Sequence, residues 1–232
     1  MAAILYSPGG IGPVPIPDLD ARLFHERHML SSAYETIAGV DEVGRGALAG
    51  PLVAAAVVLP SIDEILAERA FWNLVHDSKT MSHPRRVILA TGIRNRARAV
   101  QISAVAPHVL DAIGLGPANR MAMECAVLGL SIDPDLLLID AMTLDIGLPQ
   151  LGIIDGDARS LSIAAASIVA KVARDSVMCD LDRHYPVFGF ARHKGYGVAS
   201  HLAALGEHGP CEHHRQSFAP VRLSMEVRHV SG

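Results

Sequence analysis

Four acidic residues stand beside apolar runs of the sequence, where an unpaired carboxylate is costly to bury: Asp41, Glu42, Asp140 and Asp157. Asp41 and Glu42 lie within a predicted strand, and Asp140 ends the run LLLI. Such residues also cap helices or end strands, but four together favour a metal site. Oxygen ligands suit Mg²⁺ or Mn²⁺, and such clusters support two-metal phosphoryl chemistry.

Residues able to bind phosphate follow the acidic positions. Gly44-Arg45-Gly46 comes directly after the first acidic pair, so exposed backbone N–H groups and one guanidinium could meet an anion there. Ser78-Lys79 forms a second polar segment. Lys171 and Arg174 share one side of a predicted helix, at i and i+3. Each segment has an ordinary alternative: a hairpin turn, a helix end or a solvated stripe.

The segment HKGYG places Lys194 and Tyr196 between glycines, so both side chains are expected on an exposed loop. A loop tyrosine can stack on a sugar or base, and its hydroxyl can contact a ribose 2′-OH. A tyrosine packed within the loop is the alternative. The later cluster His213-His214-Arg215 contains possible metal ligands, but no spaced partner supports that role.

The surrounding patterns predict an α/β fold, with a mixed five-stranded sheet, flanking helices and a C-terminal helical region. The expected strands cover residues 36–43, 51–59, 100–106, 135–142 and 151–154. The glycine-linked first pair should form a hairpin buried on both faces, and the fourth strand should end at Asp140. The expected helices cover about 18–31, 62–76, 117–130, 160–185 and 198–206, with another after His83-Pro84.

We expect a flexible arm at 1–17, one catalytic domain at 18–222 and a tail at 223–232. Half of the residues are hydrophobic, which allows a sizeable core and argues against disorder. The net charge of −4 argues mildly against a nucleic-acid partner, yet the only three lysines all lie in segments named above.

The cysteines Cys125, Cys179 and Cys211 are too widely spaced to indicate a zinc site or a disulfide framework. No secretory signal or membrane span is recognisable in the sequence. The expectation is a soluble, cytoplasmic monomer that makes no contact with membranes.

Several segments, taken in order, resemble the type 2 ribonucleases H, specifically the bacterial ribonuclease HII family. The resemblance covers about residues 37–221 and rests on AGVDEVGRGALAGPLVAAAVVL, DSKTMS, DLLLID, GDARSLSIAAASIVAKVARD, YPVFGFARHKGYG and HRQSFAPV. It implies a ribonuclease H-like fold and a catalytic, metal-binding quartet of Asp41, Glu42, Asp140 and Asp157. The glycine-arginine-glycine element maps to Gly44–Gly46, and the tyrosine that senses an RNA–DNA junction maps to Tyr196.

The resemblance also implies a reaction and a substrate. Such enzymes hydrolyse the RNA strand of RNA/DNA hybrids and cut 5′ to ribonucleotides embedded in duplex DNA, leaving 3′-OH and 5′-phosphate ends. A role in genome maintenance follows. The related ribonuclease HIII has an extra N-terminal domain, for which the roughly 35 residues preceding the matched segment are too few.

Three positions depart from the family pattern. Thr80 stands where a second lysine is common, Ala141 where glycine is usual, and Asp155 where lysine is common. Asp155 places negative charge near the expected metal site. Two other functions remain open from the sequence: a related nuclease that acts on DNA alone, and a non-catalytic module that binds nucleic acid or cations.

Overall fold

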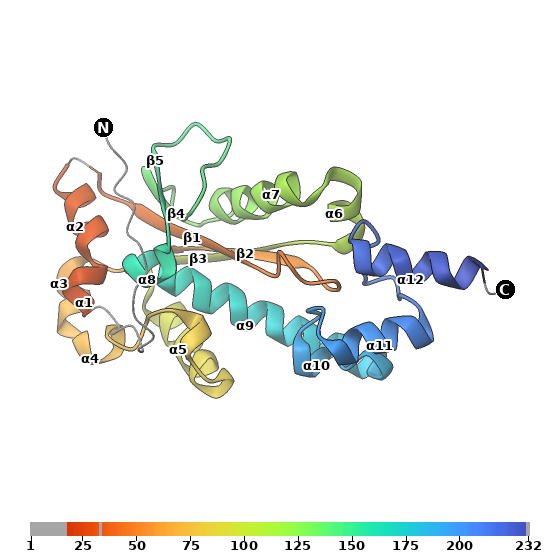
Figure 1. The fold of residues 1–232 in the computed structure, drawn as a ribbon. Helices are drawn as coiled ribbons and strands as arrows, with labels where there is room; N and C mark the ends of the chain where they lie inside the picture. The colour runs from red at the N-terminus through yellow and green to blue at the C-terminus, as the bar shows by residue number, and fades with distance from the viewer. Residues whose placement is uncertain (1–17, 33, 231–232) are drawn as a thin grey trace, which may run out of the picture.

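The computed structural model describes residues 18–32 and 34–230 of the chain. The arm expected at 1–17 and the last two residues of the expected tail lie outside the described residues. Figure 1 shows a central sheet with helices on both faces and a group of short helices at each end. Within the described part, no helix is long and apolar enough to cross a membrane.

The predicted mixed sheet of five strands is confirmed, with the order β3-β2-β1-β4-β5. β1 pairs antiparallel with β2 and parallel with β4, β2 pairs antiparallel with β3, and β4 pairs parallel with β5. The strands are β1 (Ile37–Val43), β2 (Leu52–Val58), β3 (Ala99–Val105), β4 (Leu136–Asp140) and β5 (Gln150–Ile153). The parallel pairing matters for function because it brings the carboxyl ends of β1 and β4 to the same edge.

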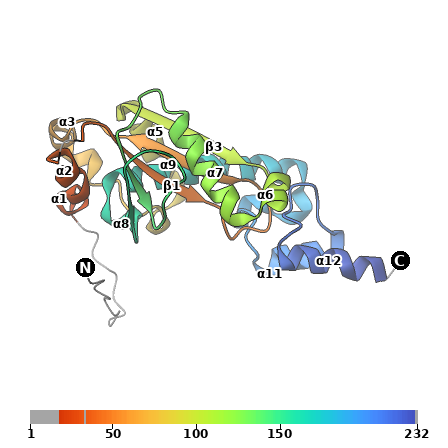
Figure 2. The same ribbon diagram turned by 90° about the horizontal axis from the view of Figure 1, so that it is seen from above.

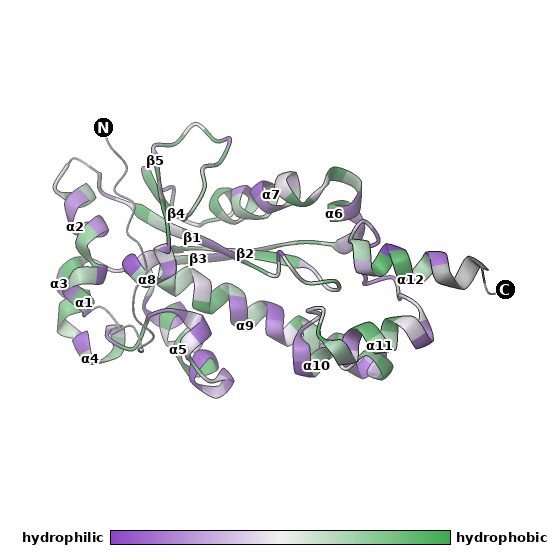
Figure 3. Ribbon diagram, viewed as in Figure 1, coloured by the Kyte–Doolittle hydropathy of each residue, from purple (hydrophilic) through white to green (hydrophobic). Residues whose placement is uncertain are grey.

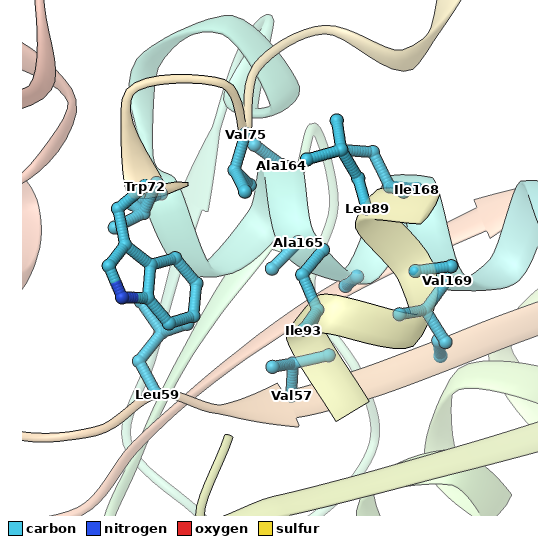
Figure 4. Close-up of a cluster of buried hydrophobic side chains, with 14 of the residues drawn as sticks. Val57, Leu59, Trp72, Val75, Leu89, Ile93, Ala164, Ala165, Ile168 and Val169 are labelled. Atoms are coloured by element: carbon cyan, nitrogen blue, oxygen red, sulfur yellow. The ribbon is translucent and has the colours of Figure 1, made fainter. Parts of the chain in front are cut away.

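Strand β2 is buried along its whole length, as the hairpin prediction required. Its alternate residues point to opposite faces of the sheet. Val53, Ala55 and Val57 pack toward α9 (Leu161–His184) and α5 (His83–Arg96), in the cluster drawn in Figure 4. The intervening residues pack toward α7 (Leu115–Leu128) on the other face. Small and β-branched side chains therefore let one strand serve two cores.

The long helix α9 crosses the sheet directly beneath β1. Ser160 caps its first turn by accepting a hydrogen bond from the Ile163 backbone N–H. A Cβ at Gly39 would stand 2.1 Å from the Ser162 carbonyl carbon, so only glycine allows this approach. Close packing of α9 on β1 holds the helix beside the end of the strand that carries Asp41.

The two ends of the molecule are helical (Figure 2). The helix expected at 18–31 is divided at Leu23, and the one expected at 62–76 is divided at Glu68 and ends at Trp72. The N-terminal group is α1 (Leu19–Arg22), α2 (Phe24–Leu30), α3 (Ile62–Ala67) and α4 (Arg69–Trp72). The other helical elements are η1 (Ser78–Thr80), α6 (Pro107–Ile113), α8 (Gly156–Arg159), η2 (Pro186–Phe188), α10 (Phe190–His193), α11 (Ala199–His208) and α12 (Ala219–Val230).

Helix α12 crosses the boundary that the sequence suggested between domain and tail, since it continues from Ala219 to Val230. Its inner side joins the C-terminal cluster through the fully buried Val221. Coloured by hydropathy, the helices carry both hydrophobic and hydrophilic residues, as expected of helices with one buried and one exposed side (Figure 3).

Candidate active site

The carboxyl ends of β1 and β4 bring two of the predicted acidic residues together. The register pairs Val40 with Ile139, so the following residues, Asp41 and Asp140, are neighbours across the parallel ladder. Asp41 is 5% exposed, and its Oδ1 accepts a hydrogen bond from the Glu42 N–H at 2.7 Å. Asp140 Oδ1 accepts one from the Gly156 N–H at 2.8 Å, which ties it to the start of α8.

Glu42 reaches the same site although its neighbour in the strand points to the opposite face. It lies one residue before the end of β1, where the chain turns into the glycine loop. Asp41, Glu42 and Asp140 all line one pocket of about 420 Å³, which we call the acidic cleft. Its other lining residues are Val43, Gly44, Arg45, Gly46, Ser78, Lys79, Ser167, Lys171 and Tyr196.

Asp157, at the first turn of α8, is the fourth predicted carboxylate and is also buried. It does not line the acidic cleft directly but raises the pKa of both Asp41 and Asp140 by charge repulsion. Its Oδ2 accepts a hydrogen bond from Lys79 Nζ at 3.0 Å. The four carboxylates therefore share one region, in which the Lys79 ammonium pairs with Asp157.

The environment of the cleft disfavours the ionised form of three of the four carboxyl groups, those of Asp41, Glu42 and Asp140. Burial, followed by repulsion from Glu42, raises the pKa of Asp41 well above its ordinary value. Burial also raises the pKa of Glu42 and of Asp140, although Arg45 partly offsets this at Glu42. A divalent cation would relieve both the repulsion and the desolvation of these groups.

The donor set fits a hard divalent cation, because it consists of carboxylate oxygens without cysteine or histidine. Among the residues described, no group of three or more His, Cys, Asp or Glu side chains is already arranged to hold a metal ion. The Lys79–Asp157 ion pair and the Gly156–Asp140 hydrogen bond each occupy an oxygen that a cation could use. A cation that used Asp157 Oδ2 would therefore compete with Lys79 for that oxygen.

The loop after β1 carries the predicted glycine-arginine-glycine element. Gly44 has φ +93°, and a Cβ there would stand 2.1 Å from Arg174 Nε, so the position requires glycine. A Cβ at Gly46 would meet no other atom within 4 Å, and Gly46 lines the cleft. The exposed Arg45 extends its guanidinium to within 3.4 Å of Glu42 Oε1. This loop supplies N–H groups and a positive charge beside the carboxylates.

Arg174 was predicted from the sequence to contact substrate together with Lys171, but it lies fully inside the protein. Its guanidinium donates to the backbone carbonyls of Pro51, Ala49 and Lys194, at 2.9 to 3.0 Å. The sequence could not separate it from Lys171, since both lie on one side of α9. Arg174 therefore positions the loops around the cleft and does not face a ligand.

The remaining predicted residues surround the cleft. Ser78 is buried, with its Oγ 3.0 Å from Ser167 Oγ, and Lys171 donates to Asp175 Oδ1 at 2.7 Å. Tyr196 lines the cleft, and Ala47 forms an isolated β-bridge with it. Lys194 lies outside the acidic cleft, in an adjoining groove that Lys171 and Tyr196 also line.

That adjoining groove, of about 630 Å³, is rich in cationic side chains and continues from the cleft; we call it the basic groove. Its lining residues are His83, Arg86, Lys171, Asp175, Cys179, Ala191, Arg192, His193, Lys194 and Tyr196. A positive groove beside a carboxylate cleft is suited to a polyanion whose backbone passes the site of reaction.

Comparison with known proteins identifies the family of this chain. The family description "Ribonuclease HII" matches residues 38–221. The chain belongs to the ribonuclease HII family. Ribonuclease HII of Geobacillus thermodenitrificans is 47% identical over 204 residues, covering 88% of this chain and 76% of that protein. Ribonuclease HII of Roseiflexus castenholzii is 48% identical over 197 residues, covering 84% and 87%.

Solved structures agree on the fold. Ribonuclease H2 from Pyrococcus horikoshii superposes with a TM-score of 0.74 at 24% identity, covering 84% of this chain and 99% of that one. Bst-RNase HIII in complex with Mn²⁺ superposes with a TM-score of 0.67 at 17% identity, covering 83% of this chain and 70% of that one. The RNase HII of the PCNA:RNase HII complex from Archaeoglobus fulgidus superposes with a TM-score of 0.64 at 26% identity. The match covers 78% of this chain and 92% of that one.

Membership of the ribonuclease HII family makes this chain a metal-dependent endonuclease that hydrolyses phosphodiester bonds. It also supports ribonuclease H activity on RNA/DNA hybrids. The α/β ribonuclease H-like fold expected from the sequence is thereby confirmed.

Two of the departures from the ribonuclease HII pattern have a structural context. Ala141, at the position where the family usually has glycine, has φ +52°, a left-handed conformation that glycine adopts without strain. Asp155 is also left-handed at φ +54°, a conformation that aspartate tolerates better than most residues. The charge of Asp155 reaches Asp140 and raises its pKa, as the sequence suggested. Nothing in the structure explains Thr80, whose side chain bonds only to its local turn.

Sequence reasoning missed several residues of this ribonuclease HII site. Arg215 is fully buried and donates to the carbonyls of Arg45 and Gly50 at 2.9 to 3.1 Å, so it holds both ends of the glycine loop. Ser167 lines the cleft and partly offsets the raised pKa of Asp41. The only signal for Arg215 was its place in the polar cluster at 213–215, which gave no indication of its partner.

Proposed function

We propose that this enzyme cuts the phosphodiester bond 5′ to a ribonucleotide, in RNA/DNA hybrids and at single ribonucleotides embedded in duplex DNA, leaving 3′-OH and 5′-phosphate ends. The observation that carries the proposal is the shared cleft. Carboxylates for a divalent cation, a glycine loop with free N–H groups and Tyr196 all line one pocket. A phosphate at the carboxylates would place the adjoining sugar within reach of the loop and the tyrosine.

Asp41, Glu42, Asp140 and Asp157 would hold the metal, with Mg²⁺ or Mn²⁺ as the expected ions. Two bound ions supply an activated water and stabilise charge on the departing 3′ oxygen. The protein's own groups then have separate tasks. Arg45, Lys79 and Lys171 bind phosphates, Ser78 lines the base of the cleft, and Lys194 extends phosphate binding into the basic groove.

Selection of the ribonucleotide falls to the loop and the tyrosine in this proposal. The backbone of Gly44–Gly46 and the hydroxyl of Tyr196 can each hydrogen-bond a 2′-OH, which is the only group that distinguishes a ribose from a deoxyribose. The ring of Tyr196 can stack on the sugar, with the Arg174 guanidinium 5.5 Å from its centroid on the protein side. The expected role is the removal of ribonucleotides during genome maintenance.

A cleavage assay on three matched duplexes tests the proposal: all DNA, DNA with one ribonucleotide, and an RNA/DNA hybrid, each with Mg²⁺ and with Mn²⁺. Cutting of the last two, with a break 5′ to the ribonucleotide, is expected. Equal cutting of the all-DNA duplex would favour the alternative of a DNA nuclease. Binding without any cutting would favour a non-catalytic module.

A further inference from the structure

Two buried histidines outside the acidic cleft form a direct pair. His201, from α11, and His214, from the segment before α12, are 0% and 1% exposed. Their Nε2 atoms stand 3.0 Å apart. The rings of Phe188 and Phe190 lie against both, and the ring of His193 stacks on His201 with centroids 4.5 Å apart. Buried polar groups of this kind need a defined hydrogen-bonding role.

The neighbouring backbone fixes which nitrogen of each ring carries the proton. The Cys211 N–H donates to His214 Nδ1 at 3.0 Å, so that nitrogen is an acceptor and the proton of His214 is on Nε2. His214 Nε2–H then donates to His201 Nε2. The proton of His201 is therefore on Nδ1, from which it donates to the Tyr196 carbonyl at 2.9 Å. Both rings are neutral, and every hydrogen bond runs in one direction.

The same geometry excludes a metal site at this pair. Cys211 Sγ lies 3.2 Å from His214 Nδ1, whereas His201 faces the Nε2 of that same ring. The three possible ligands therefore lie on different sides of His214 and do not face a common point. The chain of hydrogen bonds ends at the backbone of Tyr196, and that is where its effect must be sought.

The hydrogen bonds of the two histidines reach the acidic cleft at the backbone of Tyr196. Its carbonyl also accepts from the Val198 N–H at 2.9 Å, and the residue forms a β-bridge with Ala47 in the loop that follows Gly46. Ala49 of that loop forms a further bridge with His214 itself. The two histidines thus connect the Tyr196 loop, the glycine loop and the C-terminal segment.

We propose that His201 and His214 are positioning residues, which fix the backbone of Tyr196 so that its hydroxyl stays directed at the ribose in the acidic cleft. The inference rests on the proposed role of Tyr196. Neither histidine touches substrate. A one-way chain of two neutral rings is well suited to this task, because each ring has a single orientation that satisfies both of its nitrogens.

Two substitutions at His201 separate its two hydrogen bonds. His201→Asn places an amide N–H where Nδ1 lies and keeps the bond to the Tyr196 carbonyl. His201→Gln extends to the position of Nε2 and keeps the contact with His214 but loses Tyr196. On a duplex with one ribonucleotide, we expect His201→Gln to lower kcat about tenfold with KM little changed, as for a displaced reacting geometry. His201→Asn should stay within about threefold of the parent enzyme.

The double variants with Tyr196→Phe test whether His201 acts through the tyrosine. Phenylalanine keeps the ring but lacks the hydroxyl, so His201→Gln should lower kcat by a clearly smaller factor in the Tyr196→Phe background than in the parent enzyme. The change in thermal stability should be the same in both backgrounds. The proposal would be overturned if the double variant lost kcat by the product of the two single losses. Equal losses of kcat in His201→Asn and His201→Gln would also overturn it, since both outcomes indicate a merely structural role.

A spectroscopic readout separates this proposal from the proposed function. The chain has four tyrosines, so fluorotyrosine labelling gives few ¹⁹F resonances, and Tyr196→Phe assigns the one of interest. That resonance should shift or broaden in His201→Gln and not in His201→Asn, whatever the enzyme cleaves. An unchanged resonance in His201→Gln would overturn the positioning role even if ribonucleotide cleavage is observed.

Discussion

The three carboxylates that line the acidic cleft differ in what they contribute. Asp41 is the most buried of the three that line the cleft, and it borders the other acidic groups, so its charge is the most strongly opposed. Its Oδ1 accepts the N–H of Glu42, and Ser167 partly offsets the rise in its pKa. Such a group is retained at a cost in stability when it serves a bound ligand.

The substitution Asp41→Asn should therefore have opposite effects on activity and stability. Cleavage should fall by at least a thousandfold, because the carboxylate is proposed to hold the metal. The metal-free protein should become more stable by about 1 kcal/mol, since a buried, repelled charge is removed. Denaturant unfolding with and without Mn²⁺ checks this, with the surface variant Asp145→Asn as control. Near-normal cleavage by Asp41→Asn would rule out its assignment.

Lys79 is expected to compete with the metal for Asp157. Its Nζ lies 3.0 Å from Asp157 Oδ2, although the lysine side chain is 78% exposed and so is free to move. In Lys79→Met, Mn²⁺ should bind several times more tightly to the free enzyme, measured by calorimetry. Cleavage at saturating metal should still fall about tenfold, because a proposed phosphate contact is lost. Weaker Mn²⁺ binding in Lys79→Met would contradict this competition.

Among the structural elements, the loop between β1 and β2 shapes the cleft, and buried arginines hold it from behind. Arg174 binds the carbonyls of Ala49 and Pro51, and Arg215 binds those of Arg45 and Gly50. Burial lowers the pKa of Arg215 to about 10, which still leaves it charged at neutral pH. The loop therefore has a fixed shape before any substrate binds.

The two glycines of this loop give a matched pair of variants. Gly44→Ala should lower the free energy of unfolding by about 1–3 kcal/mol, because φ +93° is strained for alanine and the methyl group would strike Arg174. Gly46→Ala should change it by less than about 0.5 kcal/mol, since the space is open. Both should reduce cleavage at a ribonucleotide. Equal stabilities of the two variants, measured by denaturant unfolding, would refute this account.

The histidine pair predicts a dependence of stability on pH. Burial, followed by repulsion from His201, lowers the pKa of His214 from 6.5 to about 4, and burial also lowers that of His201. Between pH 6.5 and 4 these histidines thus bind protons in the unfolded chain but stay unprotonated in the folded protein. Stability contributed by the pair is complete above pH 6.5 and is lost as pH falls toward 4.

Unfolding titrations at several pH values, compared between the parent enzyme and His214→Gln, measure this contribution. The other titratable groups near the pair are His193, His213 and Cys211, so the comparison should be repeated in His213→Gln, which retains both buried rings. The variant at position 214 should show a shallower fall in stability below pH 6.5. An identical fall in His214→Gln and the parent would contradict the lowered pKa of His214.

Across the whole molecule, positive charge is concentrated beside the acidic cleft although the net charge of the chain is negative. The chain carries −4, yet the acidic cleft opens into a groove bordered by Lys171, Lys194, Arg86 and Arg192. A polyanion that follows this groove meets positive charge locally, although the net charge of the chain is negative. This arrangement favours binding in one register over loose association with any surface.

Binding to a duplex should accordingly weaken with salt despite the acidic net charge. Each phosphate contact contributes about 0.9 to the slope of log K against log salt. Lys194→Met should reduce that slope by about one unit on all duplexes alike, measured by fluorescence anisotropy with Ca²⁺ in place of Mg²⁺. Lys79→Met gives the comparison within the cleft. A slope unchanged in Lys194→Met would remove the basic groove from the binding surface.

Much of the fold was predictable from the sequence because it depends on local patterns. The unbroken apolar run of β2 indicated a strand buried on both faces, and the run LLLI before Asp140 indicated a central strand. The long alanine-rich stretch after Ser160 indicated α9, which is capped by that serine. Periodicity and capping act between residues close in sequence, so the chain reveals them without its tertiary structure.

The destination of individual side chains was decided only by the tertiary structure. Lys171 and Arg174 share a helix side in the sequence, yet one lines the cleft and the other binds buried carbonyls. His201 and His214 carry no signal of their pairing, and residues 223–230 continue a helix where a tail was expected. Such outcomes depend on which distant segments cover a residue, and no local periodicity encodes that.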